Sequence, residues 1–361
     1  MIRSSVFPRR YVQGRGALAL FGQEASRYGR RVFCLVDAAA EKQVRARLGG
    51  LDKVACDYLA FSGHCTRREL DAVVAAIRAA GARVVAGFGG GATIDVARAA
   101  AAELDLPFLS APTIAASDAP VSGISILYDD NGVMLGRINV RNPDIVLVDT
   151  SLIVEAPVRF FIAGLGDGLA TWYEAESCRQ SYAGNVAKEQ GGQLAHATAL
   201  LCRDVILSKG RQAVADVAAH LATPDVEAVV EATVLMSGVG FESGGVAAAH
   251  AIHNGLTEIP ETKKYMHGEK VAFGLLASLF LSVRPDELRR ELFSFCADVG
   301  LPVRLAQIGI DPADVAGLQR VADRIIRTGG NIANEPFDVE AVDIVLAMRA
   351  ADNYGKAYAK A

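Results

Sequence analysis

The chain has 361 residues, of which 51 % are apolar and 22 % are charged, with a formal net charge of −4 and a sequence pI near 5.9. This length suits two domains or one large one, and the apolar content supports a large core and excludes a disordered chain. No long Lys/Arg run is present, so we expect no nucleic-acid partner.

The N-terminal sequence MIRSSVFPRRYVQG lacks the apolar core of a signal peptide, and no run of about 18 uncharged apolar residues could span a bilayer. The six cysteines form no CxxC pair, so we expect reduced thiols. These features predict a cytoplasmic protein without a membrane partner.

The first part of the chain alternates between strand and helix patterns. Short apolar runs predict strands at 31–36, 53–60, 83–89, 106–113 and 143–150, and helical spacing predicts helices at 41–48, 67–82 and 92–104. Strands that alternate with helices indicate a parallel sheet covered on both faces. The β-rich arms around Asp-Asn-Gly at 124–140 predict a separate hairpin.

The remainder of the chain has helical spacing and few strand signals. Helices are predicted at 158–180, 190–208, 224–240, 244–254, 268–282, 285–299, 312–327 and 339–357. We therefore expect an α/β domain over 1–155, with a Rossmann-like parallel sheet, and an all-α domain over 156–361.

A glycine cluster, AGFGGGATIDVARA (86–99), stands between a predicted strand and a predicted helix. Glycines allow a phosphate to approach backbone N–H groups, and the helix N-terminus favours its negative charge. A plain flexible turn is the alternative. Asp37, at the end of the first strand, could accept hydrogen bonds from an adenosine ribose and would repel a 2′-phosphate, which favours NAD, but a surface aspartate fits equally well.

Three of the six histidines lie in HAIHNGLTEIPETKKYMHGEK (250–270). His250 and His253 share a helical face, and the loop before His267 could bring His250 and His267 together with His253 beside them. Two imidazoles and one carboxylate form a catalytic divalent-metal set with an open position. Asp167 in AGLGDGLATWYEAE could supply the carboxylate or be only a helix cap, and the nearby rivals are Glu258, Glu261 and Glu269. The other histidines, at 64, 196 and 220, are expected to be structural.

Several motifs in one order resemble the iron-containing, or group III, alcohol dehydrogenases, and within them most closely the glycerol dehydrogenases. They are FGGGATIDVARA, APTIAASDAPVS, NPDIVLVDT, AGLGDGLATWYEA, SGVGFESGGVAAAHAIHNGLTEIP and YMHGEKVAFG. The resemblance covers essentially the whole chain. It implies the dehydroquinate synthase-like architecture of a nucleotide-binding α/β domain followed by a helical domain, and homo-oligomers, octamers among them.

The resemblance also implies site residues. Asp167, His250 and His267 match the ligands of a divalent metal, zinc by preference with iron(II) as the alternative, and Asp118 matches a carboxylate that contacts substrate. The positions that match the NAD site are Asp37, Gly89, Gly90, Gly91, Asp95, Thr113, Ser122, Ile124 and Tyr128. The implied reaction is reversible, NAD-dependent oxidation of glycerol or a similar vicinal diol to dihydroxyacetone.

Two departures from the resemblance concern the site. Ala92 replaces the lysine that commonly follows the three glycines, and ETKKYMHG is poorer in histidine than its counterparts. These differences keep open a related enzyme for another small hydroxy compound, such as a 2-hydroxy acid, and a protein that binds NAD without chemistry. A phosphate-gripping enzyme of the dehydroquinate synthase type is disfavoured because only Lys263, Lys264 and Lys270 lie near the metal motifs.

Overall fold

The computed structural model describes residues 2–129 and 134–359. The chain forms two compact units. Residues 6–158 and 216–238 make the first, which we call the sheet unit, and residues 1–5, 159–215 and 239–361 make the second, the helical unit. Within the parts of the chain given above, no helix combines the length and the apolarity needed to cross a membrane.

The sheet unit is built on a six-stranded parallel sheet in the order β2-β9-β6-β5-β3-β4. These strands are β2 (Tyr11–Gly14), β3 (Arg31–Asp37), β4 (Ala55–Phe61), β5 (Val84–Gly89), β6 (Phe108–Pro112) and β9 (Ile145–Asp149). The predicted parallel sheet is therefore confirmed. The sequence analysis missed β2, whose four residues are all half-buried and carry no alternating pattern.

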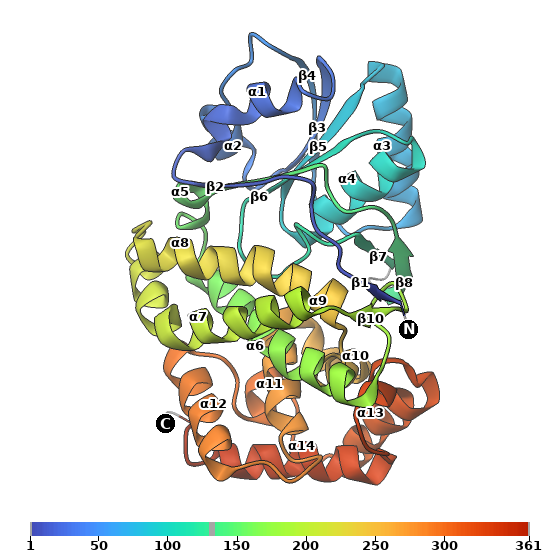
Figure 1. Cartoon of the computed structure of the whole chain (residues 1–361), viewed down its shortest axis with the longest axis vertical. Helices are drawn as coiled ribbons and strands as arrows, with labels where there is room; N and C mark the ends of the chain where they lie inside the picture. Colours follow the sequence, from blue (N-terminus) through green and yellow to red (C-terminus); the bar gives the residue numbers. More distant parts are fainter. Residues whose placement is uncertain (1, 130–133, 360–361) are drawn as a thin grey trace. The chain divides into compact units, whose positions relative to one another are not determined.

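Helices cover both faces of this sheet, as Figure 1 shows. One face carries η1 (Ala17–Leu20), α1 (Phe21–Ala25) and α2 (Glu41–Arg47), and the other carries α3 (Arg67–Ala80) and α4 (Gly91–Glu103). The sheet unit also contains α5 (Thr150–Ile153), α8 (Pro224–Glu231) and the π-helical segment η2 (Ala232–Met236). Capping residues determine where these helices begin and end, as α3 shows. The Thr66 hydroxyl accepts a hydrogen bond from the Glu69 N–H at the start of α3, and Gly81 ends that helix in the left-handed conformation at φ 59°.

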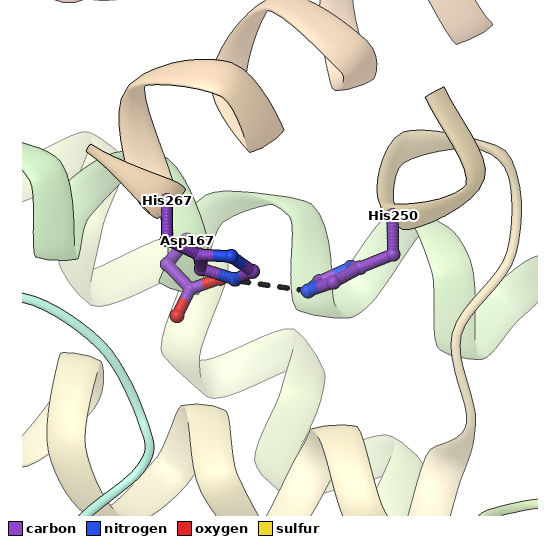
Figure 2. A group of neighbouring side chains, drawn as sticks. All are labelled: Asp167, His250 and His267. Carbon is purple, nitrogen blue, oxygen red and sulfur yellow. Dashed lines mark hydrogen bonds and ion pairs between the residues drawn. The ribbon is translucent and has the colours of Figure 1, made fainter. Parts of the chain in front are cut away.

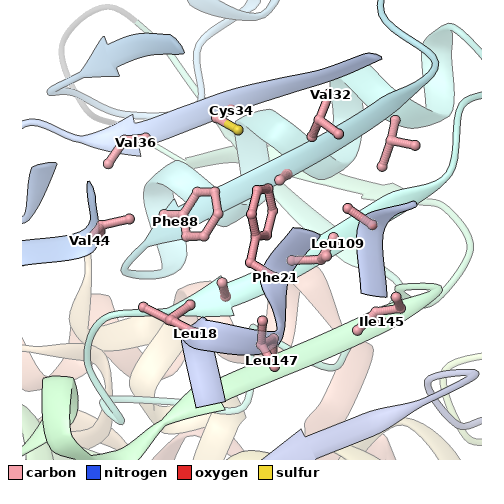
Figure 3. Close-up of a cluster of buried hydrophobic side chains, with 14 of the residues drawn as sticks. Leu18, Phe21, Val32, Cys34, Val36, Val44, Phe88, Leu109, Ile145 and Leu147 are labelled. Carbon is pink, nitrogen blue, oxygen red and sulfur yellow. The ribbon is translucent and has the colours of Figure 1, made fainter. Parts of the chain in front are cut away.

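Alternation along β3 builds two hydrophobic layers. Val32, Cys34 and Val36 point to the face covered by η1, α1 and α2, where Phe21 packs edge to face against Phe88 at 5.3 Å between ring centroids (Figure 3). Phe33 and Leu35 point to the opposite layer, under α3 and α4. Burial on both faces explains why these strands are apolar throughout.

The predicted hairpin is present as an antiparallel pair of strands, β7 (Ile124–Tyr128) and β8 (Met134–Asn139). Its Asp-Asn-Gly turn lies outside the described residues. The Tyr128 N–H donates to the Cys65 carbonyl at 2.8 Å, which ties the end of β7 to the segment before α3.

The helical unit contains most of the remaining helices and one short parallel pair, β1 (Arg3–Ser4) with β10 (Gln190–Gly191). Its helices are α6 (Val158–Ser181), α7 (Gln193–Ala218), α9 (Ser237–Gly244), α10 (Ala248–Leu256), η3 (Pro260–Lys264), α11 (His267–Ser278), α12 (Asp286–Val299), η4 (Leu305–Ile308), α13 (Val315–Thr328), η5 (Gly330–Asn334) and α14 (Ala341–Gly355). The predicted helical character of this part of the chain is confirmed.

Candidate metal centre and nucleotide-binding loop

Three side chains from three helices of the helical unit converge on one point (Figure 2). Asp167 lies in the middle of α6, His250 in the first turn of α10, and His267 at the first position of α11. The Asp167 Oδ1 atom is 3.1 Å from Nε2 of His267 and 3.6 Å from Nε2 of His250. One ligand atom from each residue lies within 4.8 Å of the others, so a single ion could contact all three.

Glycines allow the three helices to approach this closely. A Cβ atom on Gly268 would stand 1.8 Å from the Ala163 carbonyl oxygen, and one on Gly166 would stand 2.4 Å from the Gly268 oxygen. A Cβ on Gly274 would likewise meet the Ala249 oxygen at 2.4 Å, where α10 packs on α11. The glycines beside Asp167 and His267 therefore serve backbone contact between α6 and α11.

The charges in the cluster favour a cation. Burial alone would raise the pKa of Asp167, but His267 and His250 outweigh burial and hold that pKa well below its usual range. Burial lowers the pKa of His250, yet the carboxylates of Glu174 and Asp167 raise it well above its usual range. The position between these carboxylates thus favours positive charge, which a divalent ion would supply.

Each histidine of the cluster has a second partner at its other ring nitrogen. Nδ1 of His250 lies 2.6 Å from Oε2 of Glu174, and Nδ1 of His267 lies 3.1 Å from Nε2 of His253. Burial, followed by the charges of His267 and Lys270, lowers the pKa of His253 well below its usual range. His253 therefore stands beside the cluster as a neutral imidazole, at the place its spacing predicts.

The rival carboxylates have other partners. Glu269 accepts hydrogen bonds from Arg159 at 2.6 and 2.8 Å and from the Met266 N–H at 2.8 Å. Glu258 pairs with Arg324, and Glu261 is exposed on η3. Among the described residues, Asp167 is the carboxylate that joins the two histidines in a metal-sized group.

The donor set fits a catalytic divalent metal. One carboxylate oxygen and two imidazole nitrogens are the ligand types that zinc and iron(II) accept, and three protein ligands leave a position open for substrate. Asp167 is 1 % exposed whereas the His267 side chain is 42 % exposed, so one side of the cluster is accessible. The assignment of these three residues as metal ligands stays a prediction.

The glycine cluster lies at the carboxyl end of the parallel sheet. Gly89 ends β5, Gly90 precedes α4, and Gly91 begins that helix. A Cβ on Gly89 would be 2.7 Å from Thr93 and 3.0 Å from the Cβ of Asp37, so the aspartate that ends β3 lies directly beside the loop. Ligands of open α/β sheets bind at this edge, where a helix N-terminus favours phosphate.

The other predicted cofactor residues also belong to the sheet unit, and Thr113 contacts the glycine loop directly. The Thr113 N–H donates to the Gly89 carbonyl at 3.1 Å, and Ser122 and Ile124 are buried in the segment that leads into β7. Tyr128 ends β7, and burial raises its pKa to about 12. Asp118 is half-buried, and its carbonyl accepts from the Val121 N–H at 3.1 Å.

Asp95 is used inside the protein. Its Oδ1 accepts from Arg98 at 2.5 Å and its Oδ2 from the Ile126 N–H at 3.1 Å. Arg98, which is 1 % exposed, also donates to the Ala119 carbonyl at 2.6 Å and to the Ile124 carbonyl. This buried ion pair fixes the segment that carries Asp118 and Ser122 against α4.

The sequence analysis missed Glu174 and Arg98. Glu174 lies seven residues after Asp167, two helical turns further on the same face, so its position was readable once α6 was assigned. The spacing of Arg98 three residues after Asp95 on α4 suggests their ion pair, but nothing in the local sequence suggests its bonds to the carbonyls of Ala119 and Ile124.

Comparison with known proteins places this geometry in a family. The pattern that describes the iron-containing alcohol dehydrogenases matches residues 8–150. A glycerol dehydrogenase of Thermotoga maritima is 45 % identical and covers 99 % of this chain and 98 % of its own. The structure of a probable glycerol dehydrogenase from Sinorhizobium meliloti superposes with a TM-score of 0.94 at 36 % identity, over 99 % of this chain and all of that chain.

The chain therefore belongs to the iron-containing alcohol dehydrogenase family. It is an oxidoreductase, and its fold is the one predicted. Its relatives over nearly their full length include glycerol dehydrogenases. A relative with another name, the hydroxycarboxylate dehydrogenase A of Escherichia coli, is 32 % identical over 91 % of this chain and 88 % of its own.

Proposed function

We propose that this protein is an NAD- and metal-dependent dehydrogenase that reversibly oxidises glycerol to dihydroxyacetone, or a similar vicinal diol to the corresponding hydroxyketone. The convergence of Asp167, His250 and His267 carries the proposal. Full-length similarity to glycerol dehydrogenases supports the substrate.

The reaction removes a hydride and a proton from the substrate, which together are two electrons and two protons. The carbon that bears the secondary hydroxyl gives a hydride to NAD⁺, its O–H proton is released, and the C–O bond becomes a carbonyl. A divalent metal, zinc by preference, would supply Lewis acidity that favours loss of the hydroxyl proton, and NAD⁺ would supply the hydride acceptor. Asp167, His250 and His267 would hold the metal, while the half-exposed side of His267 leaves room for substrate.

The sheet unit would bind NAD. The N–H groups of Gly89, Gly90 and Gly91 would meet the pyrophosphate, and Asp37 would accept from the adenosine ribose. The cofactor would also lie against Thr113, Ser122, Ile124 and Tyr128. Because Asp95 is engaged by Arg98, its contribution would be to hold the segment that carries Asp118 and Ser122 against α4.

Removal of either histidine should abolish metal binding. H250A and H267A proteins should fold, lose zinc measured by elemental analysis, and lose NADH formation to background. A double variant without metal but with full turnover would contradict the mechanism.

Asp118 should select polyols. D118N removes a negatively charged acceptor for a second substrate hydroxyl, which should cost about 1–3 kcal/mol with diols and leave simple alcohols unaffected. The ratio of kcat/KM for 1,2-propanediol and 2-propanol, which both carry a secondary hydroxyl, measures this, and an equal loss on both alcohols would remove the selectivity role.

A second candidate is a dehydrogenase for 2-hydroxy acids. The similarity to a hydroxycarboxylate dehydrogenase favours it, as does Ala92, which departs from the lysine that the family resemblance implies. A panel of glycerol, 1,2-propanediol, simple alcohols and 2-hydroxy acids, assayed after chelation and after zinc or iron(II) is restored, decides between the two. Activity on hydroxy acids alone would overturn the glycerol assignment.

Assembly and location are also proposals. We expect a homo-oligomer, with an octamer as one form, and a cytoplasmic enzyme. Native mass measurement would test the first expectation, and fractionation of the source cells would test the second.

A further inference from the structure

The helix that carries His250 has no cap of its own. Residues 245–249, which lead into α10, are Gly-Val-Ala-Ala-Ala, and the N-cap Ala247 offers no side-chain acceptor. The first N–H groups of a helix need acceptors when they are buried. Another part of the chain must therefore supply them.

Two distant glutamates do so. Glu174, on α6, accepts through Oε1 from the N–H of Ala247 at 2.8 Å and from the N–H of His250 at 2.9 Å. Glu335 accepts through Oε1 from the N–H of Ala248 at 3.0 Å. Both glutamates are buried, so each holds the start of α10 by charge-assisted hydrogen bonds.

The second oxygens of the two glutamates differ in what they contact. Oε2 of Glu335 accepts from the Ser177 hydroxyl at 2.9 Å, away from the metal cluster. Oε2 of Glu174 lies 2.6 Å from Nδ1 of His250. The two residues are therefore matched as helix caps, and Glu174 alone of the pair touches a predicted metal ligand.

A carboxylate that accepts from Nδ1 fixes which ring nitrogen of His250 is free. An ionised carboxylate only accepts, so Nδ1 keeps its hydrogen, and Nε2 is the nitrogen left to give its lone pair to a metal ion. Nε2 is the atom that faces Asp167, at 3.6 Å. His267 has the weaker arrangement, because its Nδ1 meets the neutral Nε2 of His253 and its side chain is 42 % exposed.

We infer that Glu174 is a positioning residue for the metal site: it holds the His250 ring in the tautomer and orientation that present Nε2 to the ion, and so sets metal affinity. The inference rests on the proposed metal site. Glu335 shares only the helix-capping part of this task. Partners of this kind behind a metal-bound histidine generally change affinity by about 10- to 100-fold when they are removed.

The test compares two isosteric variants, E174Q and E335Q. In E174Q, the amide oxygen can still accept hydrogen bonds from the backbone N–H groups at the start of α10, and the amide NH₂ then faces Nδ1 of His250. This arrangement favours the tautomer with hydrogen on Nε2 and hides the lone pair from the metal. Zinc affinity, measured by competition with a chromophoric chelator, should fall about 10- to 100-fold in E174Q and stay within about twofold of wild type in E335Q.

Two further readouts separate positioning from capping. The thermal midpoints of the metal-free variants should fall by similar amounts, since both lose a charged cap. The visible absorption of the cobalt(II)-loaded proteins should change in E174Q and match wild type in E335Q. Unchanged zinc affinity and an unchanged cobalt spectrum in E174Q would overturn the inference, as would an equal loss of affinity in both variants.

Two controls keep the result interpretable. Wild-type protein that binds zinc no better than H250A would overturn the proposed metal site itself, a result distinct from failure of the Glu174 role. If E174Q does not fold, zinc-loaded wild-type protein with ¹⁵N-labelled histidine answers the same question. His250 must then show a protonated Nδ1 and a metal-bound Nε2, and the reverse assignment would overturn the inference.

Discussion

At the scale of single residues, Cys56 differs from the other cysteines of the chain. All six are free thiols, as the sequence predicts, and the other five are buried. A hydrogen bond with Cys34 is the largest cause that lowers the pKa of Cys56, to about 7, against the opposing effect of its partial burial. Burial raises the pKa of Cys65 and of Cys296 to about 12.

Alkylation should therefore select Cys56. Because the thiolate is the nucleophile, the rate with iodoacetamide should rise as pH increases to about 7 and then level off, with one adduct per chain. Intact mass measured between pH 5.5 and 8.5 follows the reaction, and a C56S protein should remain unmodified. A rate that still grows tenfold from pH 7.5 to 8.5 would indicate an ordinary thiol.

At the scale of elements, the close approach of α6 and α11 positions the metal cluster. Gly268 follows His267 directly, and its missing Cβ leaves room for the Ala163 carbonyl of α6. A G268A substitution would force the helices apart, at a cost of about 1–3 kcal/mol, and would move His267 away from Asp167. Metal sites tolerate displacements of only about 0.5 Å, so zinc affinity should fall at least tenfold.

Thermal unfolding and zinc titration of G268A measure these two losses. Gly63 provides the control, because a Cβ there would meet only Phe61, at 3.7 Å, in ordinary contact. G63A should match wild type in both measurements. A G268A protein with normal zinc affinity would show that the cluster does not depend on this helix contact.

The helices and strands also show which parts of the fold could be predicted from sequence patterns. Strands such as β3 and β5 were predictable because burial on both faces makes them continuously apolar. The candidate ligand histidines were predictable because they lie close together in the sequence. Helix α7 runs ten residues beyond its predicted end at 208. Gly210 suggests the end of a helix, but it lies inside α7 and packs against the Phe295 ring. A Cβ atom on Gly210 would be 2.9 Å from that ring. Helix α10 begins at Ala248, four residues after its predicted start, because Gly245 has φ +97°.

Tertiary partners were not predictable in this way. Helical spacing places Glu174 on the same face of α6 as Asp167, but no local pattern shows that Glu174 and Glu335 reach the start of α10 from 73 and 87 residues away along the chain. The same holds for β1 and β10, which are two residues long and are separated along the chain by residues 6–158 of the sheet unit and by α6. Short pairs and buried polar contacts depend on the folded arrangement, whereas long periodic elements carry their own signal.

At the scale of the whole molecule, the chain builds each unit from separate segments. Residues 216–238 belong to the sheet unit although they follow α6 and most of α7. Glu227 on α8 shows why: it accepts from Gln13 at 2.9 Å and from the Thr150 hydroxyl at 2.5 Å, next to β2 and β9. The two predicted functions nevertheless lie in different units, with the metal cluster in the helical unit and the glycine loop in the sheet unit. The functional division of the chain stays a prediction.

This separation predicts that zinc and NAD protect different parts of the chain. A ligand at 100 times its Kd stabilises the state that binds it by about 2.7 kcal/mol, which slows exchange through local opening by roughly 100-fold. In hydrogen–deuterium exchange, zinc should slow α6, α10 and α11, whereas NAD should slow 84–128. The H250A protein should lose the zinc effect and keep the NAD effect. Zinc protection confined to 84–128, or unchanged in H250A, would contradict the assignment of the metal to the helical unit.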